Sequence, residues 1–96
     1  MQFEWKKTEN CFAGSQSYDY RLPILASAFK AYLESWHVEE NHRFRRPVLT
    51  AAKNGLILRG ILDRQVIKVS FPEATWQADK AAFDDWLAGL VVDYHD

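Results

Sequence analysis

Hydrophobic and polar positions alternate most regularly in residues 48–71, and this stretch predicts two β-hairpins in series. Two turn dipeptides, Asn54-Gly55 and Asp63-Arg64, separate three β-rich runs: Val48–Lys53, Leu56–Leu62 and Gln65–Phe71. Asn-Gly is a strong signal for a two-residue hairpin turn because both residues tolerate a positive φ. We therefore predict a three-stranded antiparallel meander.

If both turns contain two residues, a single register holds for the whole meander. Ala51 then lies opposite Leu58, and Leu58 lies opposite Val69. One face is apolar and is predicted to belong to the core, with Leu49, Ala51, Leu56, Leu58, Leu62, Ile67, Val69 and Phe71. The other face is mixed, with Val48, Thr50, Ala52, Ile57, Arg59, Ile61, Val66, Lys68 and Ser70.

The mixed face holds more aliphatic side chains than a sheet that faces only water requires. We therefore expect this face to be covered. The cover is either a first strand together with the aromatic segment Phe12–Tyr20, or a second copy of the chain in a two-fold dimer.

An amphipathic helix is predicted from Pro23 to Trp36, where apolar residues recur at helical spacing. Proline is favoured in the first turn of a helix because its missing N–H is not needed there. Lys30 and Glu34 would then form an oppositely charged pair one turn apart on the outer face.

A second apolar stripe predicts a C-terminal helix. It starts at a cap formed by Thr75 or Asp79 and continues at helical spacing through Phe83, Trp86, Leu87, Leu90, Val91 and Tyr94. Gly89 lies inside the stripe, where glycine costs about 1 kcal/mol relative to alanine. We expect it to mark a close approach of this helix to the sheet.

The remaining segments are less regular. Phe3 and Trp5 alternate with polar residues and predict a first strand. Residues 8–20 are predicted to form a turn and loop, with a short second strand at Ser17–Arg21 as an option. Residues 37–47 are predicted to be a charged connection.

Together these elements predict an α+β fold with the order β-α-β-β-β-α. Its simplest architecture is a two-layer sandwich in which both helices pack on one face of an antiparallel sheet. With 96 residues the chain has room for one domain, residues 1–96. Six Phe, four Trp and four Tyr residues allow this short chain to bury a large area per residue.

Charge is balanced overall but uneven along the chain. The formal net charge of −1 gives no long-range attraction to nucleic acid or to an anionic membrane. Residues 41–71 carry seven basic groups and one acidic group, whereas residues 72–96 carry one basic group and six acidic groups. Either these segments neutralise each other in the fold or they make the surface dipolar.

The sequence predicts a cytoplasmic protein without membrane contact. It contains no secretory signal and no apolar stretch long enough for a membrane-spanning helix. Cys11 is the single cysteine, so no intrachain disulfide can form, and a reducing compartment fits best.

Catalytic and metal-binding patterns are not favoured. His37, Glu39, Glu40 and His42 are residue types that bind metals, but their spacing matches no metal motif. Serine-hydrolase, P-loop and dinucleotide-binding fingerprints are missing. We therefore predict no cofactor, no metal and no catalytic site. A small enzyme that uses Cys11 or the histidines stays open as the second alternative.

The basic residues are the best lead to function. Arg59 and Lys68 are predicted cross-strand neighbours on the mixed face, where like charges destabilise the sheet unless a negative group lies nearby. That group is either the chain's own, in the acidic C-terminal segment or in Glu39-Glu40, or an external acidic protein surface or phosphate.

These observations favour a non-catalytic protein-interaction module, an accessory, regulatory or immunity-like protein of bacterial type. It would bind a protein partner, or a second copy as a homodimer, through the mixed face. The predicted contact residues are Arg43, Arg45, Arg46, Ile57, Arg59, Ile61 and Lys68. The first alternative is binding of nucleic acid or a phosphate-bearing ligand through the same arginines.

Nucleic acid is the less favoured partner. Residues 23–92 are similar to double-stranded-RNA-binding domains in the order of their predicted elements. That resemblance implies a last helix that begins with phosphate-binding lysines, whereas the matching stretch 78–85 is acidic and would repel a nucleic-acid backbone.

Overall fold

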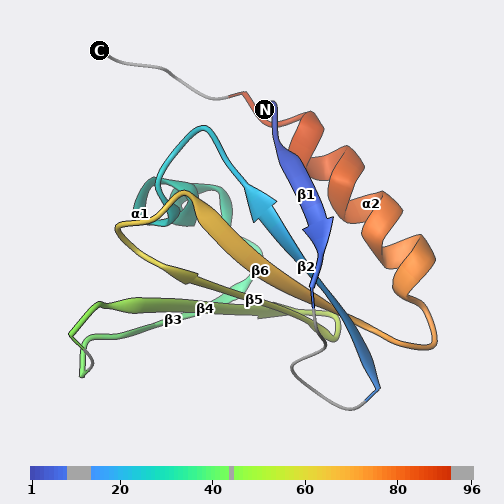
Figure 1. Ribbon diagram of the computed structural model, residues 1–96, viewed down its shortest axis with the longest axis horizontal. Helices are drawn as coiled ribbons and strands as arrows, with labels where there is room; N and C mark the ends of the chain where they lie inside the picture. The colour runs from blue at the N-terminus through green and yellow to red at the C-terminus, as the bar shows by residue number, and fades with distance from the viewer. Residues whose placement is uncertain (9–13, 44, 92–96) are drawn as a thin grey trace.

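A computed structural model describes residues 1–8, 14–43 and 45–91 and has an α+β fold, as the sequence predicts. Six strands form one antiparallel sheet: β1 (Glu4–Lys7), β2 (Ser15–Arg21), β3 (His37–Asn41), β4 (Val48–Lys53), β5 (Leu56–Ile61) and β6 (Val66–Pro72). Their order across the sheet is β1-β2-β6-β5-β4-β3 (Figure 1). The helical elements are α1 (Ala26–Phe29), the 3-10 turn η1 (Lys30–Tyr32) and α2 (Trp76–Ala88).

The central meander of β4, β5 and β6 has the predicted register. Ala51 lies opposite Leu58, and Leu58 lies opposite Val69. Asn54 and Gly55 have φ values of 50° and 85°, which is the left-handed geometry that a tight two-residue hairpin turn requires. Local turn chemistry therefore fixes the pairing of the three central strands.

Two segments are more regular than predicted: the optional strand at Ser17–Arg21 is confirmed and begins at Ser15, and the predicted charged connection contains a further strand. β2 alternates buried tyrosines, Tyr18 and Tyr20, with smaller or polar residues, and it pairs with β6 over its whole length. β3 replaces the predicted charged connection. It is an edge strand, so only Val38 has to face the core, and its other positions are exposed and polar. Charged residues on an edge strand also discourage further strand pairing.

The predicted helix over residues 23–36 is much shorter in the structure. Backbone N–H groups of Ala26 and Ser27 donate to carbonyls of Arg64 and Leu62, at 2.8 and 3.1 Å, which ties this segment to the β5–β6 turn. The chain then leaves helical geometry after Tyr32. The bonds to the turn fix the start of the helix, and after Tyr32 the apolar residues Leu33 and Trp36 pack against the core and α2 from non-helical backbone, so tertiary packing overrides the helical pattern.

Shortening this helix also changes its ion pairing. The predicted pair of Lys30 with Glu34 does not form; Lys30 Nζ instead contacts Glu40 Oε1 of β3 at 2.9 Å. The Lys30 ammonium and, to a lesser extent, His42 lower the pKa of the Glu40 carboxyl.

The C-terminal helix starts where predicted and ends earlier. α2 follows Thr75 and is capped by Gly89, while Tyr94 lies outside the described residues. The prediction that Gly89 approaches the sheet is wrong, because a Cβ there would meet only carbonyls of α2 itself, at 3.5 and 3.6 Å. The close approach occurs at Gly60 of β5, where a Cβ would lie 3.3 Å from the Ala26 Cβ.

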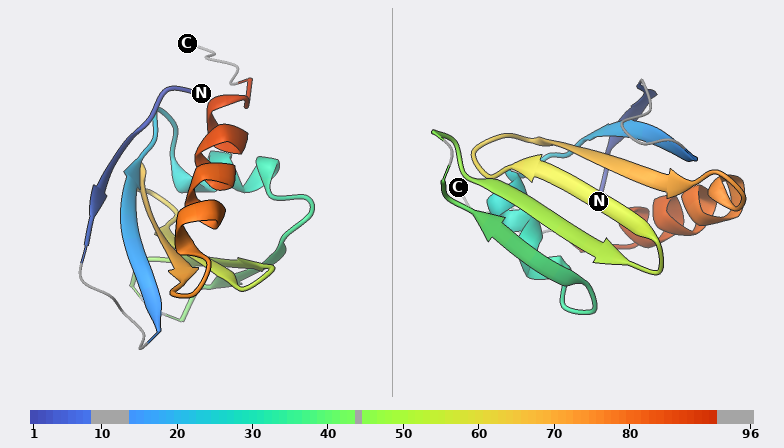
Figure 2. Two further views of the ribbon diagram at one scale, coloured as in Figure 1. Left: turned by 90° about the vertical axis from the view of Figure 1, so that its right-hand side faces the viewer. Right: turned by 90° about the horizontal axis from the view of Figure 1, so that it is seen from below.

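Both helices lie on the same side of the sheet (Figure 2), and the core lies between the two layers. The core consists of Tyr18, Tyr20, Leu22, Ala26, Phe29, Leu33, Leu49, Ala51, Leu58, Ile67, Val69, Phe71, Phe83 and Leu87. Aromatic rings join the layers: Phe83 of α2 has its ring centroid 5.1 Å from Tyr20 and 5.9 Å from Phe71. We call this side of the sheet the covered face.

A polar cluster fixes β1 and β2 to α2. Lys80 is buried, with its ammonium 3.6 Å from the centroid of the Trp5 ring and 2.8 Å from Asp84. The Tyr20 hydroxyl donates to Asp84 at 2.6 Å. Burial, followed by this hydrogen bond, raises the pKa of Tyr20 above its ordinary value. β1 therefore pairs within its own chain and packs against α2.

The structure also bears on two expectations about partners. Between residues 23 and 92 the chain forms four strands instead of three, so the element order shared with double-stranded-RNA-binding domains does not hold. No helix among the described residues is long and apolar enough to cross a membrane.

Candidate functional site

The sheet side opposite the helices contains the predicted contact residues, and we call it the open face (Figure 2). Directly paired residues in an antiparallel sheet point to the same side. The strand registers therefore define a central row across all six strands: Lys6, Asp19, Lys68, Arg59, Thr50 and Glu39. No helix or strand of the described chain lies over this row.

The centre of the row carries two adjacent positive charges. Arg59 and Lys68 are paired across β5 and β6, as predicted, and Arg59 is exposed. Carboxylates stand further along the same row: Asp19 lies directly opposite Lys68, and Glu39 lies beyond Thr50. The row thus has a carboxylate on each side of its two central positive charges.

The acidic helix does not neutralise this centre. α2 lies on the covered face, where Asp84 binds Lys80 and Tyr20. Glu40 also points to that side, and it contacts Lys30. Among the described residues, the acidic helix and the basic centre of the sheet therefore lie on opposite sides, which corresponds to the dipolar arrangement.

Aliphatic side chains flank the central row on both sides. Ile57 is paired with Ala52 and Ile61 with Val48, and both isoleucines are half-buried. Val66 begins β6 next to the end that holds Ile61. Ile57, Arg59 and Ile61 therefore share one side of β5, as the alternation predicts.

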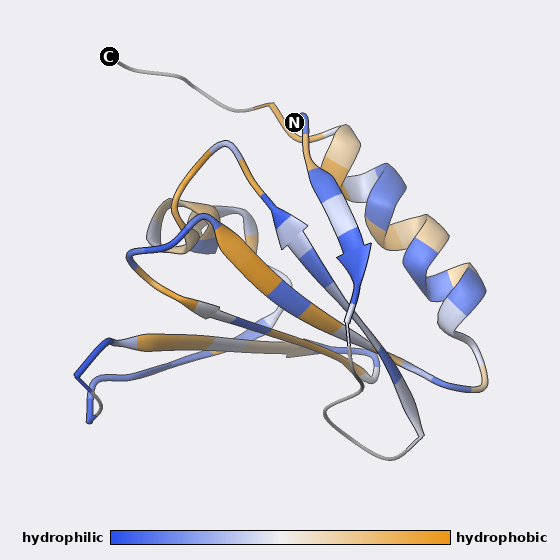
Figure 3. Cartoon of the chain, viewed as in Figure 1, coloured by the Kyte–Doolittle hydropathy of each residue, from blue (hydrophilic) through white to orange (hydrophobic). Residues whose placement is uncertain are grey.

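The three remaining predicted contacts lie in the loop between β3 and β4. Arg43, Arg45 and Arg46 are all exposed there, and this loop is among the most hydrophilic parts of the chain (Figure 3). The Leu62 N–H donates to the Pro47 carbonyl at 3.0 Å, which anchors the loop beside the end of β5. The arginines thus lie at the rim of the open face, at its Ile61 end.

Sequence reasoning did not place Lys6 or Asp19 in the central row, and it named Glu39 as a candidate negative group for Arg59 and Lys68 without a strand to position it. Asp19 and Glu39 were assigned to segments without regular pairing, so their neighbours could not be derived. The alternation in residues 15–21 and the β-branched Val38 between polar residues were the available signals.

The mixed face is buried at one end, where Ser17 and Ser70 lie on the same side as Asp19 and Lys68 with their hydroxyls 2.9 Å apart, but the predicted cover by the first strand is not confirmed. β1 and β2 lie at the edge of the same sheet, beside β6, and do not pack across it. Residues 12 and 13 of the predicted covering segment lie outside the described residues.

The described residues do not bring the candidate metal ligands together. Glu39 and Glu40 point to opposite sides of β3, and each contacts its own histidine at 3.2 Å, His37 and His42 respectively. No group of three metal-ligating side chains occurs in the described ranges. Cys11 lies outside them.

Comparison with known proteins gives no match: no family model, no curated protein and no solved structure is significantly similar to this chain. Function is therefore inferred from the chemistry of its own residues.

Proposed function

We propose that this chain is a non-catalytic binding module whose open face binds an acidic protein surface. The observation that carries the proposal is the central row, in which the paired Arg59 and Lys68 lie between flanking aliphatic positions. Protein interfaces combine apolar contacts with arginine, and complementary charges steer the encounter. The exposed arginine loop adds positive charge at the rim.

The distribution of charge favours a protein over nucleic acid. A nucleic-acid backbone presents uniformly spaced negative charges. Asp19 and Glu39 stand in the same row as the two cations and would repel such a backbone. A protein surface that carries both signs and apolar groups can match the row at each position.

The same charges disfavour one stacking of the expected homodimer. If two open faces stack about a two-fold axis parallel to the strands and centred between β5 and β6, Arg59 of one copy faces Lys68 of the other. Such like-charge contacts oppose association. An acidic partner avoids this contact, and we propose it in preference to a second copy.

The test measures binding of a glutamate–tyrosine copolymer, which presents carboxylates and apolar groups on a polypeptide. The site variant is Arg59→Gln/Lys68→Gln. The matched control, Lys7→Gln/Lys30→Gln, removes the same charge from the covered side. The proposal predicts that the site variant lowers affinity about tenfold or more, whereas the control stays within about twofold.

Equal losses in the two variants would mean that only net charge matters and would overturn the proposal. Polyuridylate that binds more tightly than the copolymer would favour the nucleic-acid alternative instead. Failure of the wild-type chain to bind the copolymer would also overturn it.

A further inference from the structure

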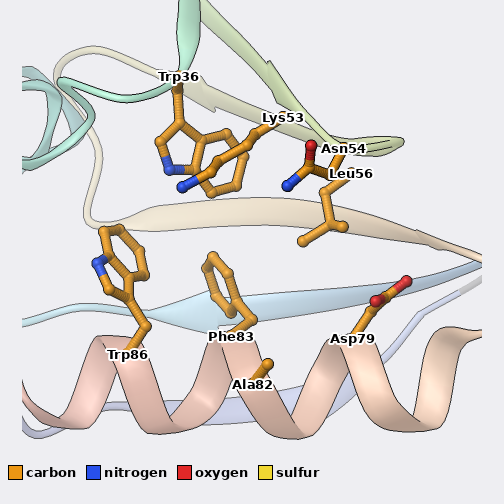
Figure 4. Close-up of a pocket in the computed structure, with 8 residues that line it drawn as sticks. All are labelled: Trp36, Lys53, Asn54, Leu56, Asp79, Ala82, Phe83 and Trp86. Atoms are coloured by element: carbon orange, nitrogen blue, oxygen red, sulfur yellow. The ribbon is translucent and has the colours of Figure 1, made fainter.

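A cleft opens on the covered side, between α2 and the β4–β5 hairpin (Figure 4). Its volume is about 250 Å³, and its lining consists of Trp36, Lys53, Asn54, Leu56, Asp79, Ala82, Phe83 and Trp86. This volume is below the roughly 300–1,000 Å³ typical of pockets for drug-sized ligands. The cleft therefore suits a compound of one or two fused rings.

The cleft exists because the helical layer is incomplete. α1 packs on β5 near Gly60, and α2 packs along β6. Since the helical segment ends at Tyr32, no helix of the described chain covers the hairpin end of β4 and β5. Trp36, just before β3, forms one side of the resulting gap.

Aromatic rings form the inner wall of the cleft. The ring centroid of Trp36 lies 6.3 Å from that of Phe83 and 6.1 Å from that of Trp86. Phe83 is buried, whereas both indoles are partly exposed. In Figure 4 Phe83 and Trp86 rise from α2 toward Trp36 on the opposite side. Such partly exposed rings offer faces and edges on which a planar ligand can pack.

Polar groups at the rim are arranged asymmetrically. Lys53 and Asn54 lie on the hairpin side, and the left-handed φ of Asn54 holds it in the tight turn. The Lys53 ammonium donates one hydrogen bond, to Ser35 Oγ at 2.8 Å, and has two further N–H donors. On the helix side, Asp79 accepts a hydrogen bond from the Thr75 hydroxyl at 2.7 Å.

We propose that this cleft binds a small planar aromatic carboxylate. The ring packs on the wall formed by Trp36, Phe83 and Trp86, and the carboxylate accepts hydrogen bonds from Lys53 and Asn54. Asp79 repels the carboxylate from the opposite rim and so fixes the orientation of the ligand. The proposal is independent of the open face, which lies on the other side of the sheet.

The experiment titrates the intact chain with three ligands of one ring system: indole-3-acetate, neutral indole and the amine tryptamine. Indole N–H resonances of Trp36 and Trp86 are followed by NMR. We expect indole-3-acetate to shift both resonances with a Kd at or below about 1 mM, the affinity typical for a ligand of this size. Indole should bind more weakly, and tryptamine most weakly.

Lys53→Met removes the charge and keeps the length of the side chain. It should weaken indole-3-acetate about tenfold and leave indole unchanged. Lys30→Met, outside the cleft, is the matched control and should change neither. The proposal is overturned if tryptamine binds most tightly, if Lys53→Met affects acid and neutral ligand alike, or if neither indole resonance shifts.

Discussion

The same strands form both faces of the sheet, but one face is buried under the helices and the other carries charged side chains. On the covered face, the row Tyr18, Val69, Leu58 and Ala51 is buried under the helices. On the open face, the neighbouring row places Arg59 beside Lys68. The covered row forms part of the core, whereas the open row lies outside it, and the proposed binding function rests on that difference.

The largest effect is expected for Phe71→Ala on the covered face. Phe71 is fully buried between Tyr18 and Phe83, with ring centroids 6.0 and 5.9 Å away. Its truncation should lower the free energy of unfolding by about 3–5 kcal/mol, through lost burial and an unfilled cavity. Urea denaturation measures this loss, and a loss below about 1 kcal/mol would contradict the proposed core.

A smaller loss is expected for Gly60→Val. A Cβ at Gly60 would lie 3.1 Å from Ile67 Cγ2 and 3.3 Å from Ala26 Cβ, so a branched side chain forces α1 away from the sheet. Overpacking of this kind costs about 1–3 kcal/mol. Gly89→Ala is the control, since its Cβ meets only helix carbonyls at 3.5 Å or more. Equal losses at both glycines would contradict the close approach at Gly60.

Some features of the fold could be predicted from local sequence, and others could not. Turn chemistry at Asn54-Gly55 and alternation in β4–β6 are local signals, and they predict the register of the meander correctly. The start of α1 is fixed by hydrogen bonds from Ala26 and Ser27 to the β5–β6 turn, which lies more than thirty residues away. No local pattern contains that information.

In the candidate sites, too, features set by local sequence could be predicted, and features set by distant contacts could not. Arg59, Ile57 and Ile61 could be assigned to one face because they alternate within one strand. The contributions of Asp19 and Glu39 depend on pairing between strands distant in sequence. The aromatic cleft could not be predicted, because it results from the early end of the helical segment.

Tyr20→Phe should cost about 1 kcal/mol, because Asp84 loses one hydrogen-bond donor and keeps Lys80. The pH dependence has a definite sign. The pKa of Tyr20 is raised in the folded state, so its contribution is complete below the unfolded value of about 10 and decreases as pH rises above it. Denaturation at several pH values should therefore show a steeper alkaline loss for the wild type than for Tyr20→Phe. Identical slopes would contradict the role of this phenol.

The smallest effect on stability is expected on the open face. Arg59→Ala and Lys68→Ala should each change the free energy of unfolding by no more than about 0.5 kcal/mol, as for other surface positions. Thermal denaturation checks this. A loss as large as that of Gly60→Val would mean that the row serves folding and would remove the contrast between the faces.

Backbone amide mapping with the glutamate–tyrosine copolymer tests the central claim most directly. The account predicts that signals of β5 and β6 around Arg59, Ile61 and Lys68 shift or broaden first, while those of α2 stay unchanged. Perturbation centred on α2, or spread evenly over every exposed cation, would contradict it.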